Sequence, residues 1–443
     1  MQYNSLEFLY GFFPLFLAVY YLFRHRHRGA VLLVGSLVFY ALSSGGSYWW
    51  VALLVLITLL SYLAGLTLGK PKRGWLLGLY LTCLLGILSF FKLWQGGRYL
   101  PAGMSFYLFQ IAAYLIDVQR QKLRPEKKLA DYMNQIIMFP KLLSGPLMQP
   151  RVLKLQEKFC RPRSRDVHDG LQLLILGLGL KVVLANRMGG IWGQANVIGF
   201  ESISTPYAWI ALASWAMQLY FDFFGYSLMA MGIGRMLGYD LPENFIDPHA
   251  SRSVSEFYRR WHATLGAWFK EYLYIPLGGN RKGTFRTLVN LAVVWLFTGL
   301  WHGVGGNYLL WAGILYVLIV NERLWLGKHL KNSRFFSHVY VVFVILLSWV
   351  PFAVGDWNQM LTFFAKLFCL GGKTLNPLDF MNLWQDYALL LGCGILCTTP
   401  LPRKLWEKIK GTTFGDFLLF ALFWVVVYYI STAAQDPFLY FQY

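Results

Sequence analysis

Long apolar segments alternate along this chain with short clusters of lysine and arginine. The apolar segments approach the length of about 20 residues that a helix needs to cross a bilayer. We predict membrane helices at 30–44, 48–68, 75–92, 104–118, 170–188, 206–236, 287–303, 307–321, 337–353, 384–400 and 413–431. The pattern therefore predicts an all-α polytopic membrane protein, a bundle of roughly 10 to 12 transmembrane helices.

The basic clusters predict the topology, because cytoplasmic loops carry an excess of lysine and arginine. The clusters lie at 24–28, 70–73, 120–128, 151–165, 280–286, 322–334 and 403–410. If all of them face the cytoplasm, each segment between two clusters crosses the membrane twice or dips in and returns. Residues 129–149 leave room for one broken segment only. We predict a re-entrant hairpin there, turning between Pro140 and Pro146 and lining a cavity.

The other connections follow from the same reasoning. We expect an outer loop at 189–204, a mildly amphipathic outer segment at 356–383 and an aromatic anchor in "FLYFQY" at 438–443. The first apolar run ends in "RHRHR", which indicates an uncleaved first span. Without an internal repeat or long linker, the chain is expected to be a single integral membrane domain, 1–443. Its expected parts are N-terminal helices at 1–128, a catalytic core at 129–325 and C-terminal helices at 326–443.

Composition agrees with a membrane protein. The chain has 57% hydrophobic and 14% charged residues, whereas soluble domains carry roughly a quarter charged residues. Its net charge of +19 would suggest nucleic acid as a partner of a soluble protein. Here the basic residues lie in short loops, so anionic lipid is the simpler explanation. The five cysteines form no CxxC pair and are predicted to be small core residues, and no metal site is expected.

One histidine interrupts an apolar segment, in "FTGLWHGVGG" at 297–306. An ionisable group within a membrane segment is costly and by default marks a functional site. We predict that His302 is a neutral imidazole able to accept a proton, with Trp301 as a flat apolar wall beside it. The nearby glycines would let other backbones or a substrate approach closely: Gly299, Gly303, Gly305 and Gly306. The alternative is a structural histidine bonded to a neighbouring helix.

A second candidate is the basic and aromatic stretch at 253–283. Ser255 is expected to cap a helix whose one face carries Trp261, Leu265, Trp268 and Tyr272. Cations crowd its flanks: Arg259, Arg260, Lys270, Arg281 and Lys282. One interpretation is an interfacial helix on anionic lipid. The other is the floor of a cavity, where the cations attract a phosphate-bearing donor and His262 faces inward.

Three further polar residues are candidates for lining the same site. Asp222 lies in an apolar segment and needs a partner; it could orient a histidine or arginine, or form a structural ion pair with Arg235 or another cation. Asn244 and Asp247 are interpreted as packing and capping residues, with site lining as the alternative. No nucleophile elbow, Walker loop or zinc motif occurs in the sequence, which favours direct transfer to a bound acceptor.

Together these motifs resemble the membrane-bound O-acyltransferase family, in its bacterial alginate O-acetylation branch. The resemblance rests on "SEFYRRWHATLGAWFKEYLYIPLGGNRKG", "NLAVVWLFTGLWHG", "LPAGMSFYLFQIAAYLIDV", "FPKLLSGPLMQP" and "YFDFFGYSLMAMGIGRMLG", in the family's order, and so covers most of 1–325. The chain departs from the branch at Tyr258, where tryptophan is usual. The resemblance implies re-entrant segments, a thin central floor and a cavity or tunnel that crosses it. It also implies His302 as the invariant histidine and His262 as the second recurring histidine.

The resemblance further implies a function. Such proteins take an acyl group from a cytoplasmic thioester and pass it across the membrane. In this branch the group is acetyl, and an extracytoplasmic SGNH-type acetyltransferase usually completes its delivery to polysaccharide. We therefore expect an acetyl-CoA-dependent acetyltransferase in a bacterial inner membrane, with His302 as general base. Expected site residues are His302 and His262 for catalysis, and Arg259, Arg260, Trp261, Arg281, Lys282 and Trp301 for donor binding. Alternatives are D-alanyl transfer from a carrier protein to teichoic acid, and a transporter without chemistry.

Overall fold

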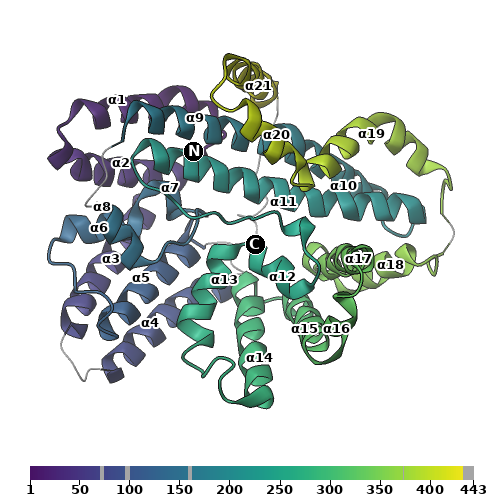
Figure 1. Cartoon of the computed structure of the whole chain (residues 1–443), viewed down its shortest axis with the longest axis horizontal. Coiled ribbons are helices and arrows are strands. Elements are labelled where there is room, and N and C mark those ends of the chain that lie inside the picture. Colours follow the sequence, from purple (N-terminus) through teal and green to yellow (C-terminus); the bar gives the residue numbers. More distant parts are fainter. Residues whose placement is uncertain (70–73, 95–99, 158–161, 373, 433–443) are drawn as a thin grey trace. The chain divides into compact units, whose positions relative to one another are not determined.

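The computed structural model describes the chain except for residues 70–73, 95–99, 158–161, 373 and 433–443 (Figure 1). Most of the described residues are helical. They form no β-sheet, and one isolated β-bridge pairs Phe245 with Trp261. The chain divides into two compact units. The first consists mainly of residues 1–177 and 226–243, and the second mainly of 178–225 and 244–429.

Seven helical segments of the described chain are long and apolar enough to cross a membrane, which confirms the polytopic class. They are Tyr48–Leu68, Gly74–Leu93, Ser164–Ile198, Gly283–His302, Gly306–Leu330, Arg334–Ala353 and Thr413–Thr432. Of the other expected spans, those at 30–44 and 104–118 correspond to helices of 16 residues each, which are shorter than a full span. Those at 206–236 and 384–400 correspond to helices of 32 and 20 residues that are not among the seven.

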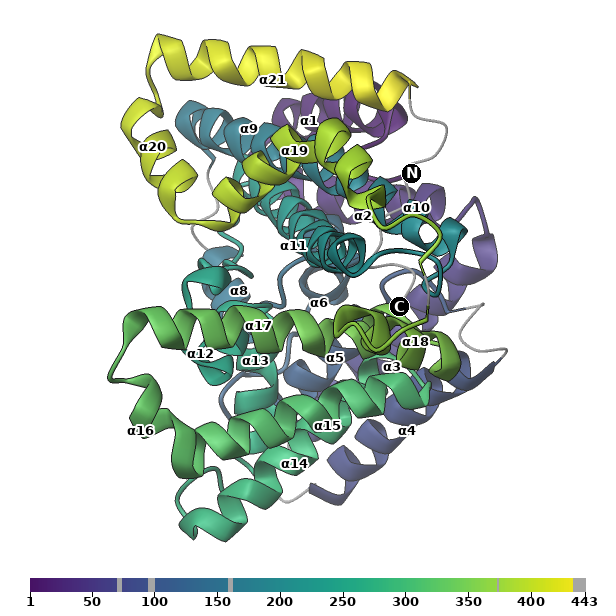
Figure 2. The same cartoon turned by 90° about the vertical axis from the view of Figure 1, so that its right-hand side faces the viewer.

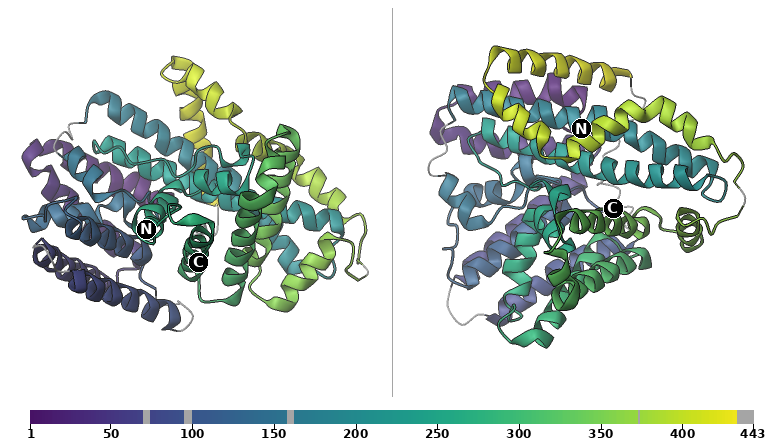
Figure 3. Two further views of the ribbon diagram at one scale, coloured as in Figure 1. Left: turned by 60° about the horizontal axis from the view of Figure 1, so that its bottom comes forward. Right: turned by 45° about the vertical axis from the view of Figure 1, so that its right-hand side comes forward.

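The first unit is a group of helices around one fully buried member. In chain order it contains η1 (Glu7–Phe12), α1 (Phe13–Leu22), η2 (His25–His27), α2 (Arg28–Ser43), α3 (Tyr48–Leu68), α4 (Gly74–Leu93), α5 (Met104–Gln119), α6 (Leu129–Ile137), α7 (Phe139–Leu142), α8 (Pro150–Glu157) and α9 (Ser164–Leu178). The dark blue α3 and α4 pack against α5 (Figure 3). Every residue of α5 from Met104 to Val118 is buried. The outward faces of α3 and α4 remain apolar, as expected for surfaces that contact lipid.

The broken segment at 129–149 has the predicted form. It consists of α6, the single turn α7 with Pro140 in its first turn, and irregular chain that leads to α8. Residues 132–148 are all buried. The buried Lys141 ammonium donates to Gln110 Oε1 at 2.8 Å, which partly offsets the cost of burying its charge. Whether this segment enters the bilayer and returns stays a prediction.

The second unit carries the candidate chemistry. In chain order it contains η4 (Gly179–Ala185), α10 (Asn186–Ile198), most of α11 (Thr205–Met236), η5 (Pro248–Ala250), α12 (Val254–Arg260), α13 (Ala263–Phe269), η6 (Lys270–Tyr274), α14 (Gly283–His302), α15 (Gly306–Asn321), η7 (Glu322–Leu326), α16 (Gly327–Leu330), α17 (Arg334–Ala353), α18 (Trp357–Leu367), α19 (Asp379–Thr398), α20 (Leu401–Ile409) and α21 (Thr413–Thr432). The green helices α14, α15 and α17 pack in sequence, α14 on α15 and α15 on α17 (Figure 2).

Three sequence expectations about this unit are wrong. Residues 189–198 are not a loop, because α10 continues through three glycines to Ile198, and only 199–204 are irregular. The stretch at 253–283 is not one helix: it breaks at Trp261 and His262, so the proposed single aromatic face does not form. The cap of α12 is Ser253, whose side chain accepts from the Glu256 N–H, because Ser255 already lies inside the helix.

The described cysteines are also not core residues. Cys83, Cys369 and Cys393 are exposed and Cys397 is half-buried. Cys83 lies on the candidate span α4, where an exposed apolar side chain faces lipid rather than water. Cys160, the basic cluster at 70–73 and the C-terminal "FLYFQY" lie outside the described residues. The expected outer segment at 356–383 contains a full helix, α18, whose amphipathic sequence buries Met360 and Phe363.

Candidate active site

His302 is the last residue of α14 and lies in an aromatic cage. Its ring centroid is 5.0 Å from that of Trp311 on α15 and 5.0 Å from that of Phe352 on α17, with both rings edge-on to it. The neighbouring Trp301 ring lies at 4.6 Å. Because three separate helices supply this cage, the half-buried imidazole is held by packing.

Glycines let α14 and α15 approach each other closely enough to form the cage. A Cβ on Gly299 would lie 3.0 Å from Ala312 Cβ and 3.1 Å from the Tyr308 carbonyl oxygen, and a Cβ on Gly303 would overlap the Tyr308 ring. A side chain at either position would push the two helices apart. The "GLWHG" glycines therefore serve the approach of a neighbouring helix, which was one of the two roles expected for them.

His262 is held in a different way, at the turn between α12 and α13. Its φ of 46° is left-handed, a conformation that costs energy for any residue with a side chain. Asn244 stabilises this turn: its Oδ1 lies 3.2 Å from His262 Nδ1 and 2.5 Å from the Thr264 hydroxyl, and its carbonyl accepts from the Ala263 N–H. Burial lowers the pKa of His262 to about 3, so the imidazole is neutral at physiological pH.

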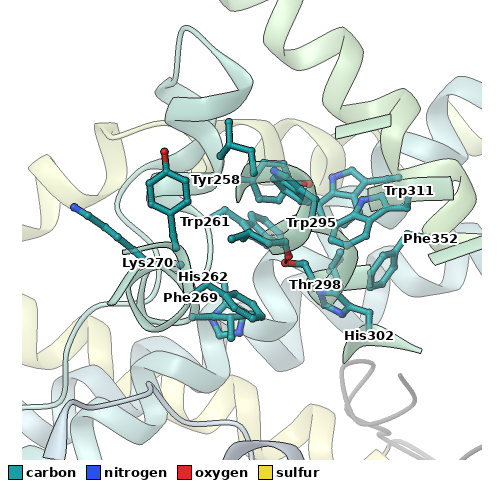
Figure 4. Close-up of a pocket in the computed structure, with 17 residues that line it drawn as sticks. Tyr258, Trp261, His262, Phe269, Lys270, Trp295, Thr298, His302, Trp311 and Phe352 are labelled. Atoms are coloured by element: carbon teal, nitrogen blue, oxygen red, sulfur yellow. Dashed lines mark hydrogen bonds between the residues drawn. The ribbon is translucent and has the colours of Figure 1, made fainter. Parts of the chain in front are cut away.

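Both histidines line one apolar cavity of about 290 Å³ (Figure 4). In the close-up, Trp311 and Phe352 gather near His302, while Phe269 and Lys270 lie on the side of His262. The indole of Trp301 packs against both imidazoles, with centroids 6.1 Å from His262 and 4.6 Å from His302. Aromatic and aliphatic side chains form most of the wall: Leu219, Tyr258, Trp261, Leu265, Phe269, Tyr274, Leu291, Val294, Trp295, Trp311, Trp349 and Phe352. A cavity of this kind excludes water from a reacting group.

A second, more polar cavity of about 660 Å³ adjoins the first. Tyr258, Tyr274 and Leu291 line both cavities, so these side chains form the boundary between them. The second cavity is lined by the exposed cations Arg252, Arg323 and Lys331, together with Ser253, Ser255, Glu256, Ile319, Glu322, Gly327 and Leu330. It therefore presents positive charge next to the apolar cavity.

The two carboxylates of the polar cavity already have partners within the protein. Glu322 accepts from the Val254 N–H at 2.5 Å and from the Ser255 N–H at 3.0 Å, so it caps the start of α12. Glu256 pairs with Arg260 at 2.6 Å. Because these carboxylates are engaged, they compete less with an anionic ligand for the three cations.

The structure brings together only part of the expected site. Trp261, His262 and His302 line the apolar cavity, and Trp301 packs against both histidines. The expected donor-binding cations line neither cavity: Arg259, Arg260, Arg281 and Lys282. Lys270 does line the apolar cavity. Two aromatic residues of the cage, Trp311 and Phe352, were not predicted because they stand in apolar runs without a distinguishing signal. The cations Arg252, Arg323 and Lys331 were not predicted because they resemble any loop cation.

The buried Asp222 belongs to a structural ion pair. Its Oδ1 lies 2.7 Å from Lys181 Nζ, and both side chains are 2% exposed. Arg235, the partner named in the sequence analysis, instead contacts Asp240 at 3.2 Å and Asp169 at 3.4 Å. Asp222 thus forms a structural ion pair, which was one of its two interpretations, and its partner is Lys181. Asn244 contacts His262, whereas Asp247 Oδ2 lies 3.9 Å from Arg403 Nη1.

Comparison with known proteins agrees with this site. Residues 75–345 match the family model of the membrane-bound O-acyltransferases, MBOAT. The chain is 32% identical to a protein of Pseudomonas putida named "Probable alginate O-acetylase AlgI", over the full length of both chains. It is 28% identical to the peptidoglycan O-acetyltransferase of Helicobacter pylori, over 88% of this chain and 85% of the relative. A teichoic acid D-alanyltransferase of Streptococcus thermophilus is 25% identical, over 51% of this chain and 57% of the relative.

These findings define the class of protein in two steps. The helical membrane fold with two histidines on an apolar cavity is that of a polytopic membrane enzyme. The chain belongs to the membrane-bound O-acyltransferase family and is an O-acyltransferase of its alginate O-acetylase-like branch. The alternative of a transporter without chemistry is therefore wrong. An O-acyltransferase requires an acyl donor. Among the described residues, no group of three or more histidine, cysteine or acidic side chains is placed to hold a metal ion.

Proposed function

We propose that the protein moves an acetyl group from a cytoplasmic thioester, acetyl-CoA, across the membrane for O-acetylation of an extracytoplasmic polysaccharide. The observation that carries this proposal is the apolar cavity lined by both His302 and His262. Similarity over the whole chain to an alginate O-acetylase, and over most of it to a peptidoglycan O-acetyltransferase, supports acetyl as the group and polysaccharide as the acceptor. The proposed location is the bacterial inner membrane.

The proposed chemistry uses His302 as general base. The imidazole takes the proton of an attacking hydroxyl while the hydroxyl oxygen adds to the thioester carbonyl carbon. The tetrahedral oxyanion then collapses, the carbon–sulfur bond breaks, and the imidazolium returns its proton to the leaving thiolate. The candidates to stabilise the oxyanion are backbone N–H groups between Gly299 and Gly306; the Gly303 N–H already donates to the Gly299 carbonyl at 3.2 Å, which favours those of residues 304–306. The aromatic cage supports this role because it excludes water without adding a competing charge.

The proposed donor path runs from the polar cavity to the apolar one. Arg252, Arg323 and Lys331 would attract the phosphates of acetyl-CoA, and the thioester arm would pass the shared boundary at Tyr258 and Tyr274. Arg259, Arg260, Arg281 and Lys282 line neither cavity, so their proposed contribution is long-range attraction of the anionic donor. The hydroxyl on the far side belongs to the polysaccharide or to an SGNH-type extracytoplasmic acetyltransferase that delivers the group.

Transfer of radiolabelled acetyl from acetyl-CoA in proteoliposomes tests this function. Wild-type protein should transfer label to a hydroxyl acceptor, and His302→Ala should lose transfer while remaining folded. His329→Ala is the matched control, because His329 is an exposed histidine that packs edge-on against Trp325 and lines neither cavity. Unchanged transfer by His302→Ala would contradict the assignment of the base.

The donor path has its own test. Replacing Arg252, Arg323 or Lys331 by alanine should raise the KM for acetyl-CoA by about 1.4- to fivefold each, because exposed ion pairs contribute about 0.2–1 kcal/mol. The matched control is Lys408→Ala, which removes an exposed cation that lines neither cavity and is not among the proposed donor-binding residues. An unchanged KM in the triple variant would contradict the path.

D-alanyl transfer from a carrier protein is the second candidate. It is supported by the similarity to a teichoic acid D-alanyltransferase, although that similarity covers only 51% of this chain. Parallel assays with acetyl-CoA and with a D-alanyl carrier protein separate the two. Transfer from the carrier protein alone would replace acetyl by D-alanyl as the proposed group.

A further inference from the structure

The contacts around His262 determine which of its ring nitrogens carries the proton. His262 Nδ1 lies 3.2 Å from Asn244 Oδ1, and the Thr264 hydroxyl lies 2.5 Å from the same atom. Both contacts converge on the same atom, the amide oxygen Oδ1 of Asn244, and the Thr264 hydroxyl donates to it.

An amide oxygen only accepts hydrogen bonds, so His262 Nδ1 must donate. A neutral imidazole has a single ring proton, and that proton is then on Nδ1. We infer that Asn244 is a positioning residue that holds His262 in its Nδ1–H tautomer and leaves Nε2 as a hydrogen-bond acceptor. Asn244 itself is 1% exposed, and its backbone carbonyl also accepts from the Ala263 N–H at 2.9 Å. The backbone of Asn244 is therefore bound to the turn that carries the histidine, which fixes where its side chain starts.

This tautomer limits what His262 can do in the reaction, an inference that rests on the proposed function. With Nε2 unprotonated, His262 accepts a hydrogen bond from an O–H or S–H group. It does not donate to the oxyanion of the tetrahedral intermediate, so the oxyanion is stabilised by other groups. Because the attacking hydroxyl has a single hydrogen, which His302 removes, the hydrogen bond to His262 comes from a second O–H group of the bound substrates, and His262 orients that group.

The surroundings of His262 keep the tautomer neutral. Phe223 packs edge-on at 4.7 Å and Trp301 lies at 6.1 Å, and neither titrates. The titratable side chains that line the same cavity are His302, Lys270, Tyr258 and Tyr274. They include no carboxylate, so no anion in the cavity wall favours the imidazolium. The lowered pKa of His262, about 3, agrees with this arrangement.

The first experiment reads the tautomer directly. Protein labelled with ¹⁵N-histidine is examined in nanodiscs, and the His262 signals are assigned by their loss in His262→Asn. The expected spectrum has a protonated Nδ1 and an unprotonated Nε2 that persist down to about pH 5. A proton on Nε2 would overturn the inference. This readout does not depend on turnover, so it stands even where the acetyl transfer assay fails.

The second experiment uses kinetics. Asn244→Ala removes the acceptor and should lower kcat by about 10- to 100-fold, as loss of a residue that orients a functional histidine typically does. Asn244→Asp keeps an acceptor oxygen but places a negative charge beside the ring, which raises the His262 pKa toward or above its ordinary value of about 6.5. This variant should transfer acetyl at alkaline pH and lose activity as the pH falls, because protonated His262 cannot accept a hydrogen bond.

Thr264→Val is the control for the second experiment. It removes the Thr264 hydroxyl and leaves the contact between Asn244 and His262 in place, so kcat should stay close to the wild-type value. A wild-type kcat in Asn244→Ala, or a pH profile of Asn244→Asp identical to that of the wild type, would overturn the positioning role.

Discussion

The two histidines of this site share one cavity but are held by opposite means. His302 lies at the end of α14 among the rings of Trp311 and Phe352, and its nearest contacts of known length are aromatic. His262 lies at a left-handed turn and is held by the amide oxygen of Asn244. His302 is half-buried, whereas His262 is 5% exposed.

This difference indicates what each histidine is suited for. His302 is half-buried at the cavity wall beside rings that do not titrate, which suits the proposed role of a base that gains and loses a proton. An imidazole bound to a neutral amide in a dry site is fixed in one tautomer and resists protonation. The same side chain can therefore be a base in one setting and a fixed acceptor in the other.

The largest expected effect is on the chemical step. His302→Ala should lower kcat by about 10²- to 10⁴-fold, the usual value of general-base catalysis. His262→Ala should lower it less, by about 10- to 100-fold, because it orients a group instead of moving a proton. The measurement is acetyl transfer at saturating donor. A deeper loss in His262→Ala than in His302→Ala would reverse the two roles.

The next largest effect on kcat is expected for substitutions in the aromatic cage around His302. Phe352→Ala should let His302 shift and lower kcat by up to about 10²-fold, because small misplacements of reacting groups are costly. It should also lower the apparent Tm, since truncating a buried phenylalanine costs about 3–5 kcal/mol. Phe352 is 2% exposed. Phe352→Leu is the milder control. A wild-type kcat in Phe352→Ala would show that the cage is not required to place His302.

A smaller effect concerns stability and pH. The His262 pKa is about 3 in the folded protein and about 6.5 when unfolded, so between these values only the unfolded chain binds the proton. The stability that the folded protein gains from neutral His262 is fully present above about pH 6.5. The free energy of unfolding then falls as the pH drops from about 6.5 toward 3. The apparent Tm in detergent should fall from pH 7.5 to pH 5, and less steeply in His262→Asn. An equal fall in both proteins would contradict the buried neutral state.

The smallest effect is expected for a third histidine, His249. It packs edge-on against Tyr220 at 4.6 Å and Trp261 at 6.5 Å but lines neither cavity, and burial lowers its pKa to about 4. His249→Asn should therefore leave kcat close to the wild-type value and reduce only the pH dependence of the Tm. A large loss of kcat would mean that aromatic contact, rather than access to the cavity, defines a functional histidine here.

Much of the fold was predictable because membrane helices are encoded locally. The span predicted at 48–68 coincides with Tyr48–Leu68, and those predicted at 287–303 and 413–431 differ from Gly283–His302 and Thr413–Thr432 by a few residues at their ends. Each is a continuous apolar segment whose length alone matches the bilayer. The errors fall where that signal is weak, as at 189–204, where glycines and polar residues suggested a loop but α10 continues to Ile198.

The sequence by itself determined the membrane class, the family motifs and His302 as the candidate base, because each depends on residues that are adjacent in the chain. The tertiary structure decided which groups surround each histidine: Asn244 is 18 residues before His262, and Phe352 is 50 residues after His302. It also decided which cations line a cavity, Arg252 and Lys331 rather than Arg281. In the sequence these cations cannot be told apart, because each is a basic residue in a short loop. Only the packing of the helices sets their distance from the site.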